Sequence, residues 1–190
     1  VGLVEGYPDK TFRPTRTLTR AELATLLVRA KGISIPSNQA NEVFRDVKPS
    51  HWAAKYIEVA QREGLIKGYP DKTFRPNNKI TKAEGIAVVA RFENLPVPFE
   101  VNETPYSDVK TTNWSAKYIQ AAKGAGLLTY VKGQNLFPQQ EMARSEAVEL
   151  LSKTTLAGGK IKELYRWDEG FGSSSRGAAP DKPQGRASLF

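Results

Sequence analysis

The sequence contains no cysteine and a single histidine, His51, and it has no apolar run near the roughly 20 residues that span a bilayer. Without cysteine, the chain has no disulfide framework, thiolate metal site or cysteine nucleophile. One histidine is too few for a histidine-rich zinc site and disfavours a Ser-His-Asp triad. We therefore expect neither a metal nor another cofactor, and not a transmembrane protein.

What remains is the composition of a basic globular protein. Hydrophobic residues make up 39% of the 190 residues, which is enough for a packed core of about one domain. The formal net charge is +8, which favours an anionic partner. This balance indicates a binding module rather than an enzyme.

A nine-residue segment occurs twice without change. Gly-Tyr-Pro-Asp-Lys-Thr-Phe-Arg-Pro stands at 6–14 and again at 68–76, an offset of 62 residues. The same offset relates further segments to one another: 44–47 and 106–109, and 19–22, 81–84 and 143–146. A fixed period of this kind indicates one supersecondary unit used three times, each copy burying its apolar face on the others.

The three copies differ in completeness. Copy three is degenerate, because residues 129–138 replace the repeated loop with Thr-Tyr-Val-Lys-Gly-Gln-Asn-Leu-Phe-Pro. Copy one is incomplete, since a counterpart of Trp52 would lie before residue 1. We expect the following organisation: the second half of repeat 1 at 1–31, repeat 2 at 44–94, repeat 3 at 106–155, and an irregular C-terminal extension or linker at 156–190.

Each unit is predicted to be a helix, a loop and a second helix, so the predicted fold class is all-α. Ser50 is placed to cap a first helix over 51–63, with Trp52 on its apolar face and Gly64 as its stop. His51 is treated as incidental, because Asn113 replaces it in the next copy.

The second helix of each unit is predicted from a Thr-x-x-Glu capping box, in which the threonine and the glutamate each satisfy a backbone N–H. Thr19 with Glu22 forms one box and Thr81 with Glu84 another, whereas Ala143 breaks the third. The glutamates are therefore expected to be capping residues rather than catalytic acids.

Four aspartates are expected to have structural roles. Asp9 and Asp71 belong to Tyr-Pro-Asp turns, where aspartate is favoured, and no Asp-x-Asp-x-Asp array supports a calcium site. Asp46 and Asp108 are expected to cap or start the turn ahead of the tryptophan helix.

These motifs together resemble the S-layer homology domain. The resemblance rests on Phe-Arg-Asp-Val at 44–47, Trp-Ala at 52–53, Gly-Leu-Ile-Lys-Gly at 64–68 running into the repeated loop, and Ile-Thr-Lys-Ala-Glu at 80–84. It covers nearly all of residues 1–155, and several motifs recur in register. The tail is not covered.

The resemblance implies that the copies form a pseudo-threefold helical spindle. Domains of this family hold surface proteins on a bacterial cell wall by binding a pyruvylated secondary cell wall polysaccharide in grooves between copies. Carried over position by position, the implied glycan-binding residues are the cations of the helix starts, the loop glycines and the helix tryptophans: Arg20, Lys82, Arg144, Gly6, Gly68, Trp52 and Trp114.

The chain departs from the family pattern at several of these sites. Lys10 and Lys72 replace the usual glycine after Pro-Asp, so a left-handed backbone there would be strained. Lys82 replaces arginine and loses the planar fork for a carboxylate. Residues 131–135 lack the Tyr-Pro-Asp core altogether.

The cations at the helix starts have two interpretations. The positive end of a helix dipole disfavours a cation, yet Arg20, Lys82 and Arg144 all stand there. Either they are exposed charges balanced by the capping glutamate, or they join free backbone N–H groups in an anion site, which we favour because all three copies share it.

The aromatic residues also have two interpretations. Trp52 and Trp114 are either core aromatics or platforms for a sugar ring at a groove edge. Tyr7 and Tyr69 present the same choice between turn packing and glycan binding.

The expected function is non-catalytic attachment of a surface protein to an anionic cell-wall glycan, outside the cell, at the bacterial cell wall or S-layer. The alternative is a structural self-assembly module of a surface layer. A nucleic-acid partner fits the charge, but the basic residues are dispersed among acids and no nucleic-acid-binding motif is present. An enzyme ranks third, because the sequence offers no pairing of nucleophile and base.

Overall fold

The computed structural model describes residues 11–38 and 40–159. Its main helices are α1 (Arg20–Lys31), α2 (Ala54–Arg62), α3 (Lys82–Phe92), α4 (Ala116–Gly124) and α5 (Arg144–Ser152). A short helical stretch also covers 155–159. Elsewhere the described chain forms loops and isolated β-bridges without a sheet, which confirms the predicted all-α class. Gly6, Tyr7, Asp9, Lys10 and most of the predicted extension lie outside the described residues.

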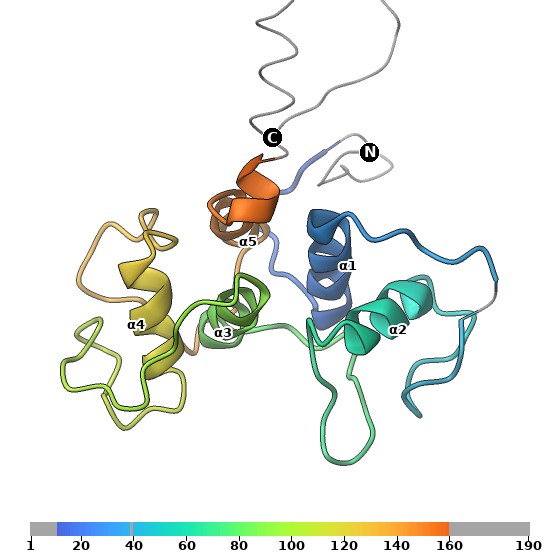
Figure 1. Cartoon of the computed structure of the whole chain (residues 1–190), viewed down its shortest axis with the longest axis horizontal. Helices are drawn as coiled ribbons and strands as arrows, with labels where there is room; N and C mark the ends of the chain where they lie inside the picture. Colours follow the sequence, from blue (N-terminus) through green and yellow to red (C-terminus); the bar gives the residue numbers. More distant parts are fainter. Residues whose placement is uncertain (1–10, 39, 160–190) are drawn as a thin grey trace, which may run out of the picture.

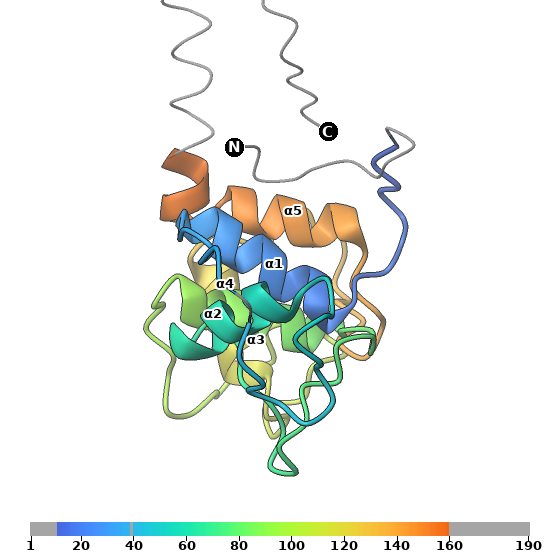
Figure 2. The ribbon, with the colours of Figure 1, turned by 90° about the vertical axis from the view of Figure 1, so that its right-hand side faces the viewer.

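The helices form an inner and an outer set. α1, α3 and α5 lie around a common axis, seen nearly end-on in Figure 1, and α2 and α4 lie outside them (Figure 1 and Figure 2). α2 packs against α1, and α4 packs against α3. Each outer helix therefore packs on the inner helix of the preceding copy, so the lobes of the fold cross the repeat boundaries.

A ring of backbone hydrogen bonds joins the starts of the three inner helices. The Leu18 N–H donates to the Met142 carbonyl at 3.0 Å, Met142 donates to Ile80 at 2.8 Å, and Ile80 donates to Leu18 at 3.1 Å. All three side chains are at most 1% exposed. The ring connects each copy to both others, so the copies share one hub. The finer expectation, the spindle of the family, stays a prediction.

The inner helices begin where the sequence predicts. Thr19 Oγ1 accepts from the Glu22 N–H at 3.2 Å, and the Glu22 carboxylate accepts from the Thr19 N–H at 2.8 Å. The second box repeats both bonds. In α5, Ala143 has no side-chain oxygen, yet the Glu146 carboxylate still accepts from its N–H at 2.8 Å. The box is therefore half retained in the third copy.

The outer helices begin later than predicted. α2 starts at Ala54 instead of residue 51, and its N-terminus has no side-chain capping hydrogen bond, so the predicted cap by Ser50 is wrong. Instead, His51 Nδ1 accepts from the Ala53 N–H at 3.1 Å, and Asn113 Oδ1 accepts from the N–H of residue 115 at 3.0 Å. His51 and its counterpart therefore share a turn-forming role, and the expectation that His51 is incidental is wrong. The predicted stop at Gly64 is confirmed by its left-handed φ of 66°.

Candidate functional site

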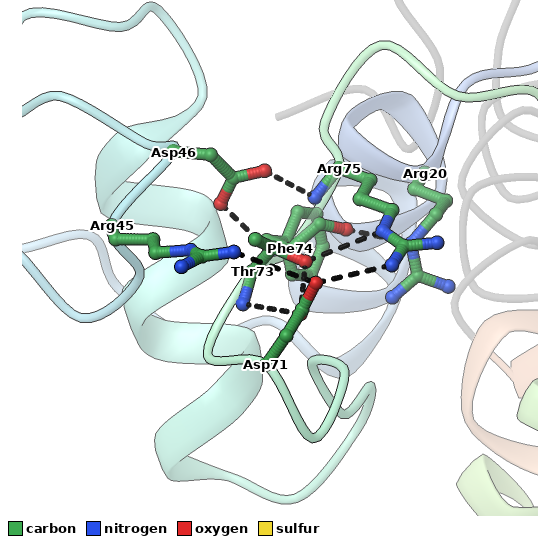
Figure 3. A network of polar contacts seen from close by, with 7 residues as sticks. All are labelled: Arg20, Arg45, Asp46, Asp71, Thr73, Phe74 and Arg75. Carbon is green, nitrogen blue, oxygen red and sulfur yellow. Dashed lines mark hydrogen bonds and ion pairs between the residues drawn. The ribbon is translucent and has the colours of Figure 1, made fainter.

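A polar network holds the loop at 66–76 between α2 and α3 (Figure 3). The Asp71 carboxylate accepts from the Thr73 hydroxyl at 2.5 Å and from the Thr73 N–H at 3.1 Å, as in an Asx turn. The Arg75 guanidinium donates to the same carboxylate at 3.2 Å. These contacts, the Thr73 hydroxyl first, lower the pKa of Asp71 from 3.8 to about 2. The predicted turn role of Asp71 is confirmed.

Asp46 closes the loop from the other side. Its carboxylate accepts from the N–H groups of Phe74 and Arg75 at 2.8 and 2.7 Å (Figure 3), and Asp108 does the same for residues 136–137 at 2.9 and 2.6 Å. The second residue of each pair has a left-handed φ, 57° and 59°. Both aspartates lie in turns ahead of the outer helices, at 44–47 and 106–109 as expected, but the expectation that their carboxylates cap those turns is wrong. Each carboxylate instead anchors a strained loop residue nearly 30 positions away.

Arg20, the first residue of α1, is buried against this loop, at 7% exposure. Its Nε donates to the Phe74 carbonyl and an Nη to the Lys67 carbonyl, both at 2.8 Å. The guanidinium lies 4.7 Å from the ring centroid of Tyr69 and 4.9 Å from that of Phe74. Burial lowers the pKa of Arg20, although arginine stays charged. Arg20 thus fastens the helix of the first copy to the loop of the second.

The two equivalent cations lie at the other two junctions. Arg144 is also 7% exposed, and its guanidinium is 5.2 Å from the ring of Phe12 in the first copy. The Lys82 side chain is 13% exposed, and its Nζ binds a Glu146 carboxylate oxygen at 2.7 Å. A hollow of about 450 Å³ lies beside Lys82 and the third loop. Tyr130 also lines this hollow, and its burial raises the pKa of the Tyr130 hydroxyl. Lys82 therefore leaves open space at the junction of the second and third copies, whereas Arg20 fills the junction of the first and second copies.

Backbone N–H groups at the inner helix starts already have partners. In α1 the N–H groups of Arg20 and Ala21 donate to carbonyls of the loop at 76–78, at 2.9 and 3.0 Å. The first two N–H groups of α3 and α5 likewise donate to carbonyls in the loops at 138–140 and 14–16. The expected anion site of free N–H groups is therefore wrong. Glycan binding by the three cationic side chains stays a prediction.

Gly68 is required by close packing. A Cβ on this residue would collide with the ring of Phe44, which is buried beneath the loop. The neighbouring Tyr69 ring is in contact with two guanidinium groups, that of Arg20 and that of Arg75, the latter 4.0 Å from its centroid. These contacts give Gly68 and Tyr69 structural roles, and glycan binding by either residue stays a prediction.

Trp52 and Trp114 are exposed, at 61% and 53%. Both lie in the turn ahead of an outer helix, before α2 and α4 respectively. The core alternative is therefore wrong for both tryptophans, and their indole rings are accessible from solvent.

An open cleft of about 570 Å³, here named the Trp114 cleft, lies beside this tryptophan. Its lining includes the rings of Trp114 and Tyr118, the cations Arg91 and Lys117, and the connector at 99–102. The Arg91 guanidinium lies 4.7 Å from the Tyr118 ring centroid. The hydrogen bond from Arg91, together with the positive charges of Arg91 and Lys117, lowers the pKa of the Tyr118 hydroxyl. The cleft thus combines aromatic faces with positive charge.

The structure separates the predicted site residues. Arg20 and Tyr69 meet at the first junction, whereas Trp114 lines a cleft that contains none of the three helix-start cations. Sequence reasoning missed Arg91 and Lys117. Their signal was in the repeat, because they stand 62 residues after Arg29 and Lys55.

Within 11–38 and 40–159, no helix is both long enough and apolar enough to cross a bilayer. In the same residues, no three histidine or acidic side chains gather as metal ligands would.

Known proteins resemble this chain over the repeats. A family model described as the S-layer homology domain matches residues 2–24, 43–84 and 105–148. "Cell surface glycoprotein 1" of Acetivibrio thermocellus is 32% identical over 164 residues, which cover 82% of this chain and 7% of that protein. The "Cellulosome-anchoring protein" of the same species is 41% identical over 120 residues, 62% of this chain and 26% of its length. The "Surface layer protein" of Brevibacillus choshinensis is 42% identical over 93 residues, 48% of this chain and 8% of its length.

The chain spans about a quarter or less of each of these relatives. The three matched segments each overlap one of the three predicted repeats, and the relatives carry names of cell-surface, surface-layer and anchoring proteins. The predicted location at the bacterial cell surface is thereby confirmed. By its repeats, its helical hub and these matches, the chain belongs to the S-layer homology domain family.

Proposed function

We propose that this chain is a non-catalytic module that anchors a surface protein to an anionic polysaccharide of the bacterial cell wall. A relative named for cellulosome anchoring, 41% identical over 120 residues, supports the anchoring role. The carboxylates at the inner helix starts support the absence of catalysis, because Glu22, Glu84 and Glu146 accept backbone N–H groups as caps.

The Trp114 cleft carries the proposal. An indole that is 53% exposed offers a flat apolar face on which a sugar ring can stack, and such a face is costly to leave in water without a ligand. Arg91 and Lys117 stand beside it and can donate charge-assisted hydrogen bonds to a carboxylate. Stacking face and cations together match an acidic sugar better than a neutral one.

The finer proposal is that the acidic group is a pyruvate ketal, as in the wall polymers that the family binds. A ketal places one carboxylate on the rim of a sugar ring, where a cation next to the stacked ring can reach it. The net charge of +8 favours such a polyanion over a neutral glycan.

The test is binding of the chain to isolated wall polysaccharide, before and after mild acid removes the pyruvate ketals. We expect binding to the intact polymer and a loss of at least about tenfold after ketal removal, because a charge-assisted hydrogen bond contributes about 1.5–3 kcal/mol. Trp114→Ala should weaken binding to the intact polymer, and Trp167→Ala, outside the repeats, serves as the control. Equal binding of both polymers would refute the carboxylate requirement.

Self-assembly of a surface layer is the second candidate. It is favoured by Phe99, whose ring is 97% exposed and available for a protein contact. This candidate requires concentration-dependent oligomers in the absence of glycan, measured by light scattering, and their loss in Phe99→Ser. A chain that stays monomeric at all concentrations would refute self-assembly and leave anchoring as the only candidate function.

A further inference from the structure

Two clusters of the same four residue types recur on the outer lobes. The first consists of Arg29, Trp52, Lys55 and Tyr56, and the second of Arg91, Trp114, Lys117 and Tyr118, each residue 62 positions after its counterpart. In both, the arginine lies over the tyrosine ring, at 5.4 Å in the first cluster and 4.7 Å in the second. Both tryptophans are more than half exposed. The repeat therefore presents the same aromatic and cationic groups twice.

The two lysines differ in their partners. The Lys55 Nζ donates to the carbonyls of Pro36 and Ser37 at 3.2 and 3.0 Å. Lys117 has no hydrogen bond or ion pair to any residue that the structure describes, and its Nζ lies 5.4 Å from the Tyr118 ring centroid. One ammonium is held by its own connector, whereas the other lines the open cleft.

The connectors explain this difference. The segment at 33–38 runs close enough to α2 for two of its carbonyls to bind Lys55. In the second connector, Phe99 stands where the first has Ser37, and its ring is 97% exposed. That connector lines the Trp114 cleft, and none of its carbonyls is bonded to Lys117.

We propose that the two clusters are unequal sites for an acidic sugar, with the Trp114 cleft as the principal one and Lys117 as its specificity-determining cation. This rests on the function proposed above. An ammonium that already donates to two carbonyls must give up those bonds to reach a ligand carboxylate, so Lys55 gains little by binding one. Lys117 gives up only water and keeps the full gain. The first connector therefore acts as an internal competitor for the first cluster.

The test uses a matched pair of variants, Lys55→Ala and Lys117→Ala, which remove the same charge at equivalent positions. The probe is a methyl glycoside with one pyruvate ketal, titrated by calorimetry into the full chain. We expect Lys117→Ala to weaken the tighter site about tenfold or more and Lys55→Ala to weaken it less than about threefold. Equal losses, or a larger loss in Lys55→Ala, would overturn the inequality.

A second measurement does not depend on these two variants. In Trp52→Phe and Trp114→Phe the remaining indoles report binding by fluorescence. The tighter site gives the fluorescence change at the lowest probe concentration. We expect the half-saturating concentration of that change to stay the same in Trp52→Phe and to rise in Trp114→Phe. The reverse pattern would overturn the proposal. If the wild-type chain bound neither this probe nor the intact wall polymer, the proposed function itself would fail, which is a different outcome from equal sites.

Discussion

Single positions in the repeated loop are under conformational strain that the surrounding contacts hold in place. Lys72 has a φ of 60°, Arg75 of 57° and Phe137 of 59°, all in the left-handed region that costs an L-residue about 1–2 kcal/mol. The missing glycine predicted the strain at Lys72. No local residue pattern indicates the strain at the other two, whose N–H groups donate to Asp46 and Asp108, nearly 30 positions away.

Lys72→Gly should stabilise the chain by about 0.5–1 kcal/mol. Glycine relieves the left-handed strain, and part of that gain is offset by the extra entropy of glycine in the unfolded chain. Urea unfolding measures the change. Lys72→Ala is the control, because alanine keeps the Cβ, and a gain as large in that variant would contradict the backbone explanation.

Acid should destabilise the loop through Asp71. Its pKa is lowered from 3.8 to about 2 in the folded chain, so its stabilising effect is fully present above pH 4 and is lost as the pH falls towards 2. Unfolding curves at pH 2 to 5 should therefore differ between the wild type and Asp71→Asn, with a shallower pH dependence in the variant. Parallel curves would contradict this assignment.

Among the helices, the inner ones are specified mainly by local signals, and their differences are visible in the sequence. α1 packs against α2, and its buried positions include Ala21, Thr25 and Val28. The equivalent positions of α5 are Ser145, Glu149 and Ser152, and α5 carries no outer helix in the described part of the chain. The polar residues suit a helix face without such a cover.

Restoring the missing cap should stabilise α5. In Ala143→Thr the new hydroxyl is placed to accept the N–H of Glu146, as Thr81 does for Glu84, and this should add about 0.5–1 kcal/mol. Thr81→Ala is the matched reverse change and should cost about as much. Thermal unfolding of both variants checks the pair, and changes of the same sign would show that capping is not responsible.

In the whole molecule, the copies are joined by contacts that no local sequence pattern predicts. The repeat, the caps and the all-α class could be predicted because each rests on residues within a few positions of one another. The Arg20 bonds to Lys67 and Phe74 span 47 and 54 positions, and the cleft beside Trp114 forms between a connector and a helix. Such groupings follow from packing. The family resemblance assigned the tryptophans and the helix-start cations alike to grooves between copies, whereas the Trp114 cleft contains none of those cations.

Arg20→Ala should lower the free energy of unfolding by about 2–4 kcal/mol. The change leaves two loop carbonyls without their donors and removes the contacts of the guanidinium with two aromatic rings. Lys82→Ala should cost less, because Lys82 makes a single ion pair at its junction. Denaturant unfolding compares the two, and a larger cost for Lys82→Ala would show that these cations do not act as fasteners.

The ring at Leu18, Ile80 and Met142 determines how the molecule responds to tension. The segment at 17–19 is bridged on one side to Ala143 and on the other to Lys79, so the first copy cannot leave the hub without breaking its bonds to both neighbours. We expect the three copies to separate together under load for this reason. A tether made in this way should withstand drag until the whole body gives way in one step.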